Sequence, residues 1–266
     1  MRKSIPDPNW PQSWRESYEY DGLEVYGASG CIGYSYAYQK RRDETLRLMQ
    51  RAAAPPARVL DVAAAQGNFS LALAEMGYEV TWNDLRADLA DYVRLKHEHG
   101  ALHFAPGNVF DLRCEPFDVV LITEVIEHVA HPDQFLAQIA RLVKPGGHVV
   151  MTTPNGGYFL NTLPKFSECK DASSFEAVQF KPNSDGHIFL LHEEEIAPLA
   201  HQAGLKVETV KIFTNPLTNG HIKTEPILRH LPGSIVNAVE LWTEALPKPA
   251  MRRLHTAMAV LLARVN

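Results

Sequence analysis

The run from Val59 to Asp84, VLDVAAAQGNFSLALAEMGYEVTWND, constrains the fold of this chain more than any other segment. A short apolar strand that carries Asp61 is followed by a turn of small residues at 63–67, and then by a helix with apolar side chains at helical spacing. A second apolar strand ends on Asp84. This strand–turn–helix–strand unit predicts an open α/β sheet with a nucleoside-type ligand beyond the carboxyl ends of its parallel strands.

The residue types in the turn restrict the class of ligand that it can bind. Small side chains at 63–67 let the backbone approach a bound molecule closely, and the N-terminus of the helix offers unpaired N–H groups to an anionic end. Asp84 is placed to accept hydrogen bonds from both hydroxyls of a ribose. The turn lacks the spaced glycines of a pyrophosphate-binding loop, so the sequence predicts a ligand with a ribose but no phosphate.

The same segment resembles motif I of the class I S-adenosylmethionine (SAM)-dependent methyltransferases. The family turn usually reads D-x-G-x-G-x-G, whereas this chain has Asp61 followed by Ala63, Ala65 and Gly67. Alanine is compatible with such a turn where φ stays negative, which is what we expect here. The resemblance implies that SAM is the cofactor, with Asp61 and the 63–67 backbone at its methionine end and Asp84 at its ribose.

Three later segments resemble the same family and occur in the family's order: Phe104–Leu112, Phe117–His128 and Leu142–Asn155. In the first of them, the resemblance places Asn108 against the adenine amine, with the Val109 backbone beside it. The match is good over roughly residues 55–160. It implies a doubly wound, mostly parallel, Rossmann-like sheet of about seven strands.

A second site is expected after the fourth strand, where Glu124, Glu127 and His128 stand at i, i+3 and i+4. If a helix opens at residue 123 or 124, the three side chains share one face at the strand tip, with Glu124 also next to the cofactor. The string EVIEH resembles the corresponding segment of the ubiquinone-pathway O-methyltransferases and of the small-RNA terminal 2′-O-methyltransferases. The latter complete a metal site with a later histidine, for which His187 is the candidate here and His192 the reserve.

Two interpretations of this second site remain open. In one, Glu124, Glu127, His128 and His187 hold a divalent cation such as Mg²⁺, which activates an acceptor hydroxyl. In the other, no metal is bound, His128 acts as the general base and Glu127 orients it. Either version predicts transfer of the SAM methyl group to a small molecule, with oxygen as the expected acceptor atom. The alternatives are an RNA terminal 2′-O-methyltransferase and a SAM-binding module without catalysis.

Composition restricts the partners. The net charge of −5 and a pI of about 6.2 make a poor electrostatic match for nucleic acid. Three scattered cysteines are typical of free thiols in a reducing compartment, and no apolar run is long enough to span a bilayer. We therefore expect a cytoplasmic enzyme with a small-molecule substrate and no membrane partner. The oligomeric state is left open.

The chain divides into an N-terminal extension, residues 1–54, and a SAM-binding domain, residues 55–266. Within the domain, the sheet core covers 55–160, and 161–266 complete the sheet and add helices. Six of the nine tyrosines lie between residues 18 and 38, among Gly27, Gly30 and Gly33, which indicates a flexible lid over the pocket or an edge packed on the core. Further expectations are a helix over 41–51 and a strand over 205–213. Residues 257–265 could form a last helix, but the family resemblance implies a final antiparallel strand there.

Overall fold

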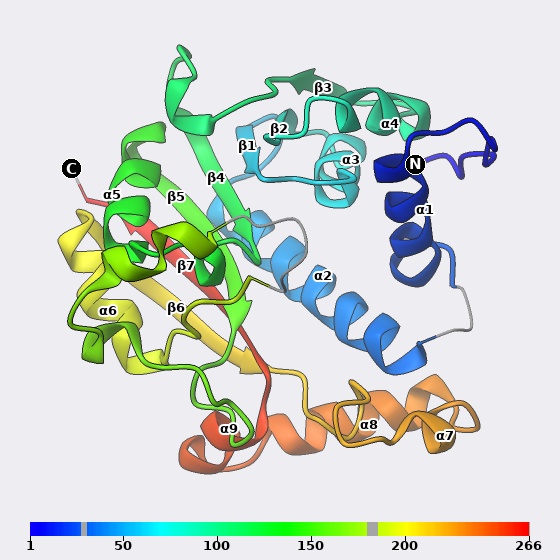
Figure 1. Cartoon of the computed structure of the whole chain (residues 1–266), viewed down its shortest axis with the longest axis vertical. Helices are drawn as coiled ribbons and strands as arrows, with labels where there is room; N and C mark the ends of the chain where they lie inside the picture. The colour runs from blue at the N-terminus through cyan, green and yellow to red at the C-terminus, as the bar shows by residue number, and fades with distance from the viewer. Residues whose placement is uncertain (28–30, 180–185, 266) are drawn as a thin grey trace.

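The computed structural model, which describes residues 1–27, 31–179 and 186–265, contains one mixed sheet of seven strands (Figure 1). Its strand order is β3–β2–β1–β4–β5–β7–β6. The strands are β1 (Arg58–Val62), β2 (Glu79–Asn83), β3 (Ala101–Phe104), β4 (Phe117–Thr123), β5 (Val143–Pro154), β6 (Leu205–Phe213) and β7 (Ala257–Arg264). The first five pair in parallel, and β7 runs antiparallel between β5 and β6.

Helices flank this sheet; within the described residues, two of them precede β1, and three lie between β6 and β7. The described helices are α1 (Gln12–Glu24), α2 (Ile32–Ala52), α3 (Asn68–Glu75), α4 (Leu89–Lys96), α5 (Pro132–Leu142), α6 (Glu193–Gln202), α7 (Glu225–Leu228), α8 (Gly233–Glu244) and α9 (Lys248–Leu254). Short 3-10 turns occur at Val109–Asp111, Ile126–His128, Phe166–Glu168 and Ala172–Val178. The doubly wound α/β fold expected from the sequence is therefore confirmed.

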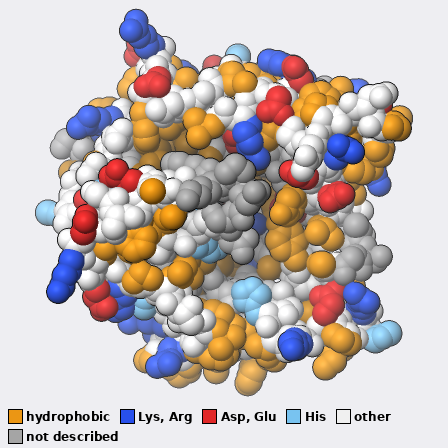
Figure 2. All heavy atoms as spheres, in the orientation of Figure 1, with side chains coloured by type: hydrophobic (Ala, Val, Ile, Leu, Met, Phe, Trp, Pro, Cys, Tyr) orange, Lys and Arg blue, Asp and Glu red, His pale blue; other side chains and the backbone are white. Residues whose placement is uncertain are grey.

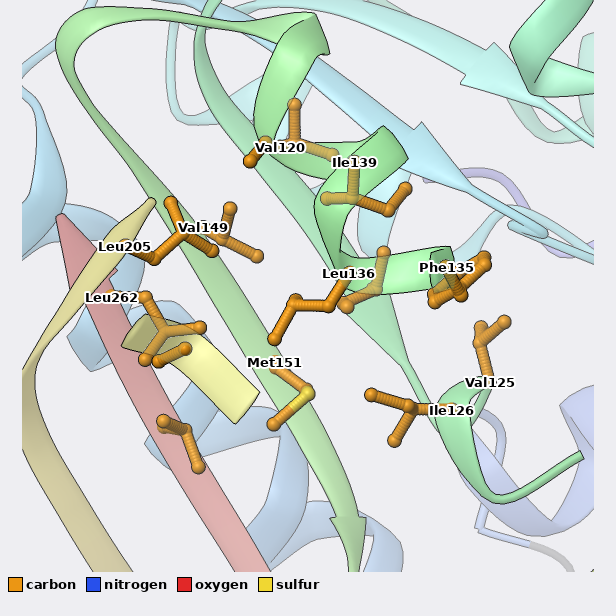
Figure 3. Close-up of a cluster of buried hydrophobic side chains, with 14 of the residues drawn as sticks. Val120, Val125, Ile126, Phe135, Leu136, Ile139, Val149, Met151, Leu205 and Leu262 are labelled. Atoms are coloured by element: carbon orange, nitrogen blue, oxygen red, sulfur yellow. The ribbon is translucent and has the colours of Figure 1, made fainter. Parts of the chain in front are cut away.

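The sheet is buried on both faces, as a parallel sheet requires. On one face, Leu48 and Met49 of α2 pack with Phe69 and Leu73 of α3 against the strands. On the other face, side chains of α5 and α6 close a larger apolar cluster with Val120, Val149, Met151 and Leu262 (Figure 3). Near-continuous apolar strands such as β4 and β7 follow from this two-sided burial.

The sheet order places a ligand crevice. Strand β1 lies between β2 and β4, so the chain winds outward in opposite directions from the β1–β4 pair. At such a switch point, the loops that leave the two neighbouring strands diverge and open a crevice at their carboxyl ends. The turn at 63–67 and the segment that follows Thr123 both leave the sheet at this point.

Several element predictions are confirmed, and one is revised. The strands over 205–213 and 257–264 are present, the second being antiparallel as expected. The predicted helix over 41–51 is the C-terminal half of a longer helix, Ile32–Ala52. The tyrosine-rich stretch is mostly helical, in α1 and the first turns of α2, and Gly30 lies outside the described residues.

Candidate active site

The turn after β1 has a left-handed backbone at all three positions where the family pattern has glycine. The φ angles are 53° at Ala63, 48° at Ala65 and 72° at Gly67. The expectation that φ stays negative at the two alanines is wrong. The backbone N–H of Ala64 donates to Asn83, and the indole of Trp82 donates to the Ala65 carbonyl, so neighbouring contacts hold the turn in place. Each alanine then costs roughly 1–2 kcal/mol relative to a right-handed conformation.

The two acids of this unit have different surroundings. Asp84, at the end of β2, accepts a hydrogen bond from the Ala65 N–H (2.9 Å) and from the N–H and guanidinium of Arg86. Asp61 is fully buried, accepts a hydrogen bond from the Ser70 hydroxyl (2.6 Å), and lines neither of the cavities described below. Burial raises the pKa of Asp61 to about 7, partly opposed by hydrogen bonds from Ser70. Asp84 is also buried and lines neither cavity, but unlike Asp61 it bonds directly to the turn backbone at Ala65 and to Arg86, which lines the polar cavity.

Two cavities meet at Ala63, one on each side of the turn. The apolar cavity, of about 380 Å³, lies between the ends of β2 and β3 and helix α5. The polar cavity, of about 390 Å³, lies between the turn, α1 and α2. The apolar cavity is lined by residues that include Val62, Asn83, Leu85, Asn108, Val109, Phe110, Val129 and Phe135, and the polar cavity by residues that include Tyr20, Glu24, Tyr34, Tyr38, Arg41, Gln66, Arg86 and Glu124. Together they form an extended crevice over the switch point.

Asn108 and Val109 contribute to the apolar cavity, where the resemblance places adenine. The Asn108 side-chain oxygen accepts a hydrogen bond from the Phe110 N–H (3.1 Å), which fixes the amide at the start of a 3-10 turn. Asn83 braces the adjoining loop through bonds from its amide to the carbonyls of Ala105 and Gly107. Both amides are thus held by the backbone of the loop after β3.

The segment after β4 departs from the predicted helix. Glu124 has a φ of 54°, and only a short 3-10 turn, Ile126–His128, follows. Glu124 therefore does not share a face with Glu127 and His128. It forms an ion pair with Arg41 of α2 (3.0 Å) and lines the polar cavity. Glu124 is therefore not in the group of described residues that could hold a metal ion, which is Glu127, His128 and His187.

Glu127, His128 and His187 come together as a group that could hold a metal ion. One ligand atom from each lies within 4.8 Å of the others, and the two imidazole rings are 4.8 Å apart at their centroids. The Ile188 N–H donates to the Glu127 carbonyl (2.7 Å), and this backbone contact holds the later segment beside the 3-10 turn. Burial, and then the nearby charge of Glu124, raise the pKa of Glu127. Its Oε2 accepts a hydrogen bond from Thr153, and its buried Oε1 has no hydrogen-bond partner among the described residues.

A close backbone approach at Gly156 supports this group. A β-carbon at Gly156 would lie 2.0 Å from the Leu190 carbonyl oxygen and 2.6 Å from the His192 ring. The Gly156 N–H donates to the Leu191 carbonyl (2.9 Å), so the segment after His187 is held against the end of β5. His192 itself caps helix α6 together with Glu195, and it is not part of the metal-ligand group.

Helix α1 supplies a carboxylate that the sequence analysis did not single out. Glu24 lines the polar cavity and accepts hydrogen bonds from Gln66 and Asn68, both at 2.9 Å, and from the Tyr34 hydroxyl at 2.7 Å. Burial raises the pKa of Glu24. Arg41 was missed in the same way. Because their partners lie 10 to 83 residues away in the chain, no local spacing could have revealed either role.

Comparison with known proteins now decides the family. A family model described as a methyltransferase domain matches residues 35–210, more than half of the chain. The chain belongs to this methyltransferase family. It is a class I SAM-dependent methyltransferase, and the SAM cofactor inferred from the turn and Asp84 agrees with that membership.

Curated relatives resemble part of this methyltransferase. The ubiquinone biosynthesis O-methyltransferase of Xanthomonas campestris is 37% identical over 110 residues, which cover 40% of this chain and 46% of the relative. The enzyme of the same name from Caulobacter vibrioides is 32% identical over 166 residues, covering 60% of this chain and 64% of the relative. The chain thus spans less than two thirds of the length of these relatives.

Solved structures with low sequence identity share the fold. The magnesium protoporphyrin IX methyltransferase of Synechocystis PCC 6803, with bound SAH, aligns over 95% of this chain and 93% of its own, at a TM-score of 0.57 and 13% identity. The cyclase SpnF aligns over 99% of both chains, at a TM-score of 0.55 and 16% identity. Because a cyclase is among these neighbours, the fold alone does not determine the chemistry.

Proposed function

We propose that this methyltransferase transfers the methyl group of SAM to a hydroxyl oxygen of a small molecule. The observation that carries the proposal is the convergence of Glu127, His128 and His187 after the carboxyl end of β4. The adjoining residues Glu124 and Val125 line the two cavities that meet at Ala63. Methyl transfer to a hydroxyl oxygen requires removal of its proton, and a histidine within hydrogen-bond reach of the hydroxyl can accept it. The names of the curated relatives support the same acceptor atom.

In this proposal, SAM lies across Ala63 with its two ends in the two cavities. The adenine ring occupies the apolar cavity, where Asn108 and the Val109 backbone contact it, and Asp84 accepts hydrogen bonds from the ribose hydroxyls. The methionine end occupies the polar cavity against the backbone of Ala65 and Gly67. The volumes of about 380 and 390 Å³ accommodate the two halves of the molecule.

The reaction then needs alignment and removal of one proton. The acceptor oxygen attacks the methyl carbon in line with sulfur, the carbon–sulfur bond breaks, and sulfur keeps the electron pair as the thioether of S-adenosylhomocysteine. His128 accepts the hydroxyl proton, directly or through water, and Glu127 orients the adjoining backbone and ring. Excluding water from the crevice strengthens these contacts.

The donor set fits a divalent cation. A buried carboxylate oxygen of Glu127 without a hydrogen-bond partner among the described residues, together with two imidazoles, makes a two-nitrogen, one-oxygen set. Two imidazole ligands favour a transition ion such as Zn²⁺, Fe²⁺ or Mn²⁺ over Mg²⁺. A bound ion supplies Lewis-acid activation, which lowers the pKa of the acceptor hydroxyl.

We further propose that residues 1–54 form the substrate-side cover of the crevice, distinct in role from the sheet domain at 55–266. Tyr20 of α1 and Tyr34 and Tyr38 of α2 line the polar cavity. Their aromatic faces suit a sulfonium cation or a flat acceptor. Because α1 and α2 are packed helices, this cover is a wall of the site rather than a loose flap.

A methyl-transfer assay with and without chelator tests the proposal. Purified protein is given SAM and a panel of phenols, carboxylates, sugars and short RNA, and S-adenosylhomocysteine is measured. We expect turnover on a phenol or another hydroxyl compound and a fall of about 100-fold in His128→Ala, the size of a typical general-base contribution. His103→Ala, at an exposed position of β3, is the matched control.

The outcomes separate the two versions of the site. Loss of transfer with chelator, restored by Mn²⁺ or Zn²⁺, supports the metal-assisted version, in which Glu127→Gln and His187→Ala are also inactive. Indifference to chelator with loss in His128→Ala alone supports the general-base version. Full activity of His128→Ala on every acceptor would exclude both.

A further inference from the structure

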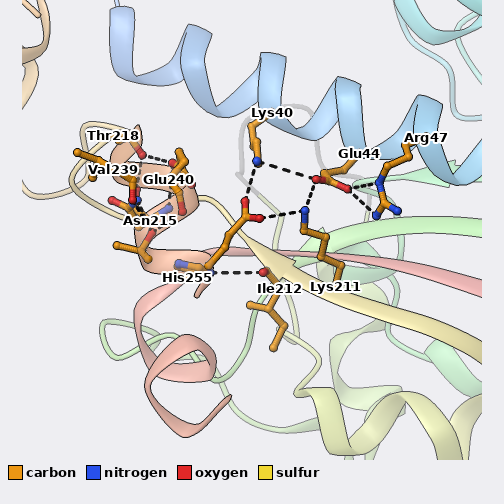
Figure 4. A network of polar contacts seen from close by, with 12 residues as sticks. Lys40, Glu44, Arg47, Lys211, Ile212, Asn215, Thr218, Val239, Glu240 and His255 are labelled. Carbon is orange, nitrogen blue, oxygen red and sulfur yellow. Dashed lines mark hydrogen bonds and ion pairs between the residues drawn. The ribbon is translucent and has the colours of Figure 1, made fainter. Parts of the chain in front are cut away.

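Helix α8, Gly233–Glu244, carries its acidic side chains inward. Glu240 is 6% exposed and accepts hydrogen bonds from the Thr218 hydroxyl and the Asn215 N–H. Glu244 forms ion pairs with Lys40 of α2 (2.7 Å) and Lys211 of β6 (3.0 Å) (Figure 4). Both carboxylates of this helix are therefore used to attach it to the body of the protein.

The outer face of α8 is apolar. Ile235, Leu241 and Trp242 are 46%, 64% and 66% exposed, and Ala238 lies exposed between them, with Ser234 and Asn237 as the exposed polar side chains of the helix. On an ordinary surface helix, charged residues face solvent and apolar residues face the core. On α8, Val236 is buried as usual, but both acids also face inward and the exposed side carries no charged residue, which indicates that something covers it.

Exposed apolar side chains also occur on the segments that precede α8 in the chain. Ile227 of α7 is 61% exposed, and Leu217 and Ile222 are each 40% exposed. Of the fourteen large hydrophobic residues exposed in the described chain, six lie between residues 217 and 242. Scattered exposed leucines are normal, but a concentration of this kind marks an interaction surface. Figure 2 shows apolar side chains gathered along the lower edge of the molecule, where α7, α8 and α9 lie in Figure 1.

Basic side chains accompany this apolar surface. Between residues 225 and 254 the acids are Glu225, which pairs with Arg229, and Glu240 and Glu244, which face inward; the exposed basic side chains are Arg229, Lys248, Arg252 and Arg253. Arg252 is paired with Glu193 of α6. The rest of the chain is acidic enough to bring the total to −5. The exposed side of α7–α9 therefore carries more basic than acidic side chains, on a protein that is acidic as a whole.

We propose that this face, defined by Ile227, Ile235, Leu241 and Trp242 with its basic rim, docks on an anionic lipid surface. Helices with Trp and Leu on one side and Lys and Arg beside them lie in the plane of a membrane interface, with the indole at headgroup level. Lys248 and Arg253 are drawn to anionic headgroups. No described helix is long and apolar enough to cross a membrane, so the contact is peripheral. A membrane contact of this kind is contrary to the sequence-based expectation of no membrane partner.

A second copy of the chain is the competing occupant, and charge disfavours it. In a two-fold symmetric dimer the same patch meets itself, so the basic rim of one copy would face the basic rim of the other. Like charges opposed across an interface weaken association. An anionic lipid surface complements both the apolar centre and the basic rim. The proposal is independent of the methyl-transfer chemistry.

Vesicle co-sedimentation of the full chain tests the proposal. Vesicles of phosphatidylcholine alone are compared with vesicles that contain equal parts of phosphatidylcholine and phosphatidylglycerol. We expect binding to the anionic vesicles that falls with added salt, and a loss of about tenfold or more in Leu241→Ser/Trp242→Ser. Lys248→Gln/Arg253→Gln should lose about tenfold on anionic vesicles. Ile5→Ser, which removes an 87% exposed side chain elsewhere, is the matched control and should bind as wild type.

Folding of each variant is checked by its calorimetric response to S-adenosylhomocysteine, which the surface substitutions should leave unchanged. Equal vesicle binding by wild type and Leu241→Ser/Trp242→Ser would overturn the proposal. So would absence of binding to anionic vesicles. A concentration-dependent dimer that is abolished by the same double substitution, without vesicle binding, would assign the face to a second copy instead.

Discussion

Asp61 near the end of β1 and Asp84 just after β2 are both buried, but only Asp84 bonds to the turn at Ala65 and to Arg86, which lines the polar cavity. The positions of the two acids near the carboxyl ends of adjacent strands were predictable from the sequence, because the motif and the strand lengths determine where each acid falls. Their separate roles were not, since burial of Asp61 depends on how α3 covers β1. The left-handed backbone at Ala63 and Ala65 was also hidden, because nothing in the alanine side chain reports its φ angle.

Titration of Asp61 gives the first residue-scale prediction. Burial raises the pKa of this carboxyl from 3.8 to about 7, so the folded protein holds the proton more tightly than the unfolded chain does. The stabilising contribution is therefore complete below about pH 4 and is lost as the pH rises toward 7, by up to about 4 kcal/mol. Urea unfolding from pH 4 to 8 should show a flatter profile in Asp61→Asn. An unchanged profile would contradict the assignment.

Asp84→Ala tests the ribose contact. Loss of two hydrogen bonds to ribose should weaken S-adenosylhomocysteine binding by roughly 100-fold, since each bond to a charged group contributes about 1.5–3 kcal/mol and part is recovered by water. Titration calorimetry measures it. Glu79→Ala, at the opposite end of β2, serves as control because its side chain is 45% exposed and away from the crevice. Wild-type affinity in Asp84→Ala would refute the contact.

At the scale of elements, the strands were predictable and the helix contacts were not. Apolar runs bounded by turns mark β1, β4, β6 and β7, because a buried strand needs little more than that pattern. Helix α1 has no clear apolar stripe, and its inward residues Asp21 and Glu24 are acidic. Such a helix docks through polar partners far away in sequence, so its tyrosines could be interpreted as a flexible lid.

A buried ion pair holds α1 against α4. Lys96 and Asp21 are both fully buried at 2.7 Å, and Lys96 also donates to Asn68, whose amide donates to Glu24. Burial lowers the pKa of Lys96. Lys96→Met leaves Asp21 as an unpaired buried carboxylate and should lower the free energy of unfolding by about 3–5 kcal/mol.

The double variant Lys96→Met/Asp21→Leu provides the control for this prediction. Because it removes both charges, its loss in the free energy of unfolding should be considerably smaller than the sum of the losses in the two single variants. Chemical denaturation of the four proteins gives the coupling. Additive losses would show that the pair does not act as a unit.

At the scale of the molecule, the switch point between β1 and β4 makes one crevice out of two cavities. A ligand that spans Ala63 contacts the sheet, α1 and α5 at once. S-adenosylhomocysteine at 100 times its Kd should therefore stabilise the protein by about 2.7 kcal/mol and raise the Tm by roughly 5–10 °C. Scanning calorimetry should show this shift in wild type and a much smaller one in Asp84→Ala. Equal shifts in both proteins would place the ligand elsewhere.

Gly156 has a consequence for how the enzyme tolerates change. Any side chain there would collide with the Leu190 carbonyl and push the loop around Leu190 outward. His187, three residues earlier in the same loop, would move with it. Gly156→Ala should thus leave cofactor affinity intact while turnover collapses, as assays of the two properties in parallel would show. Gly156, which contacts neither the reactants nor an ion, would then be as essential for turnover as His128 and His187, whose approach to each other depends on it.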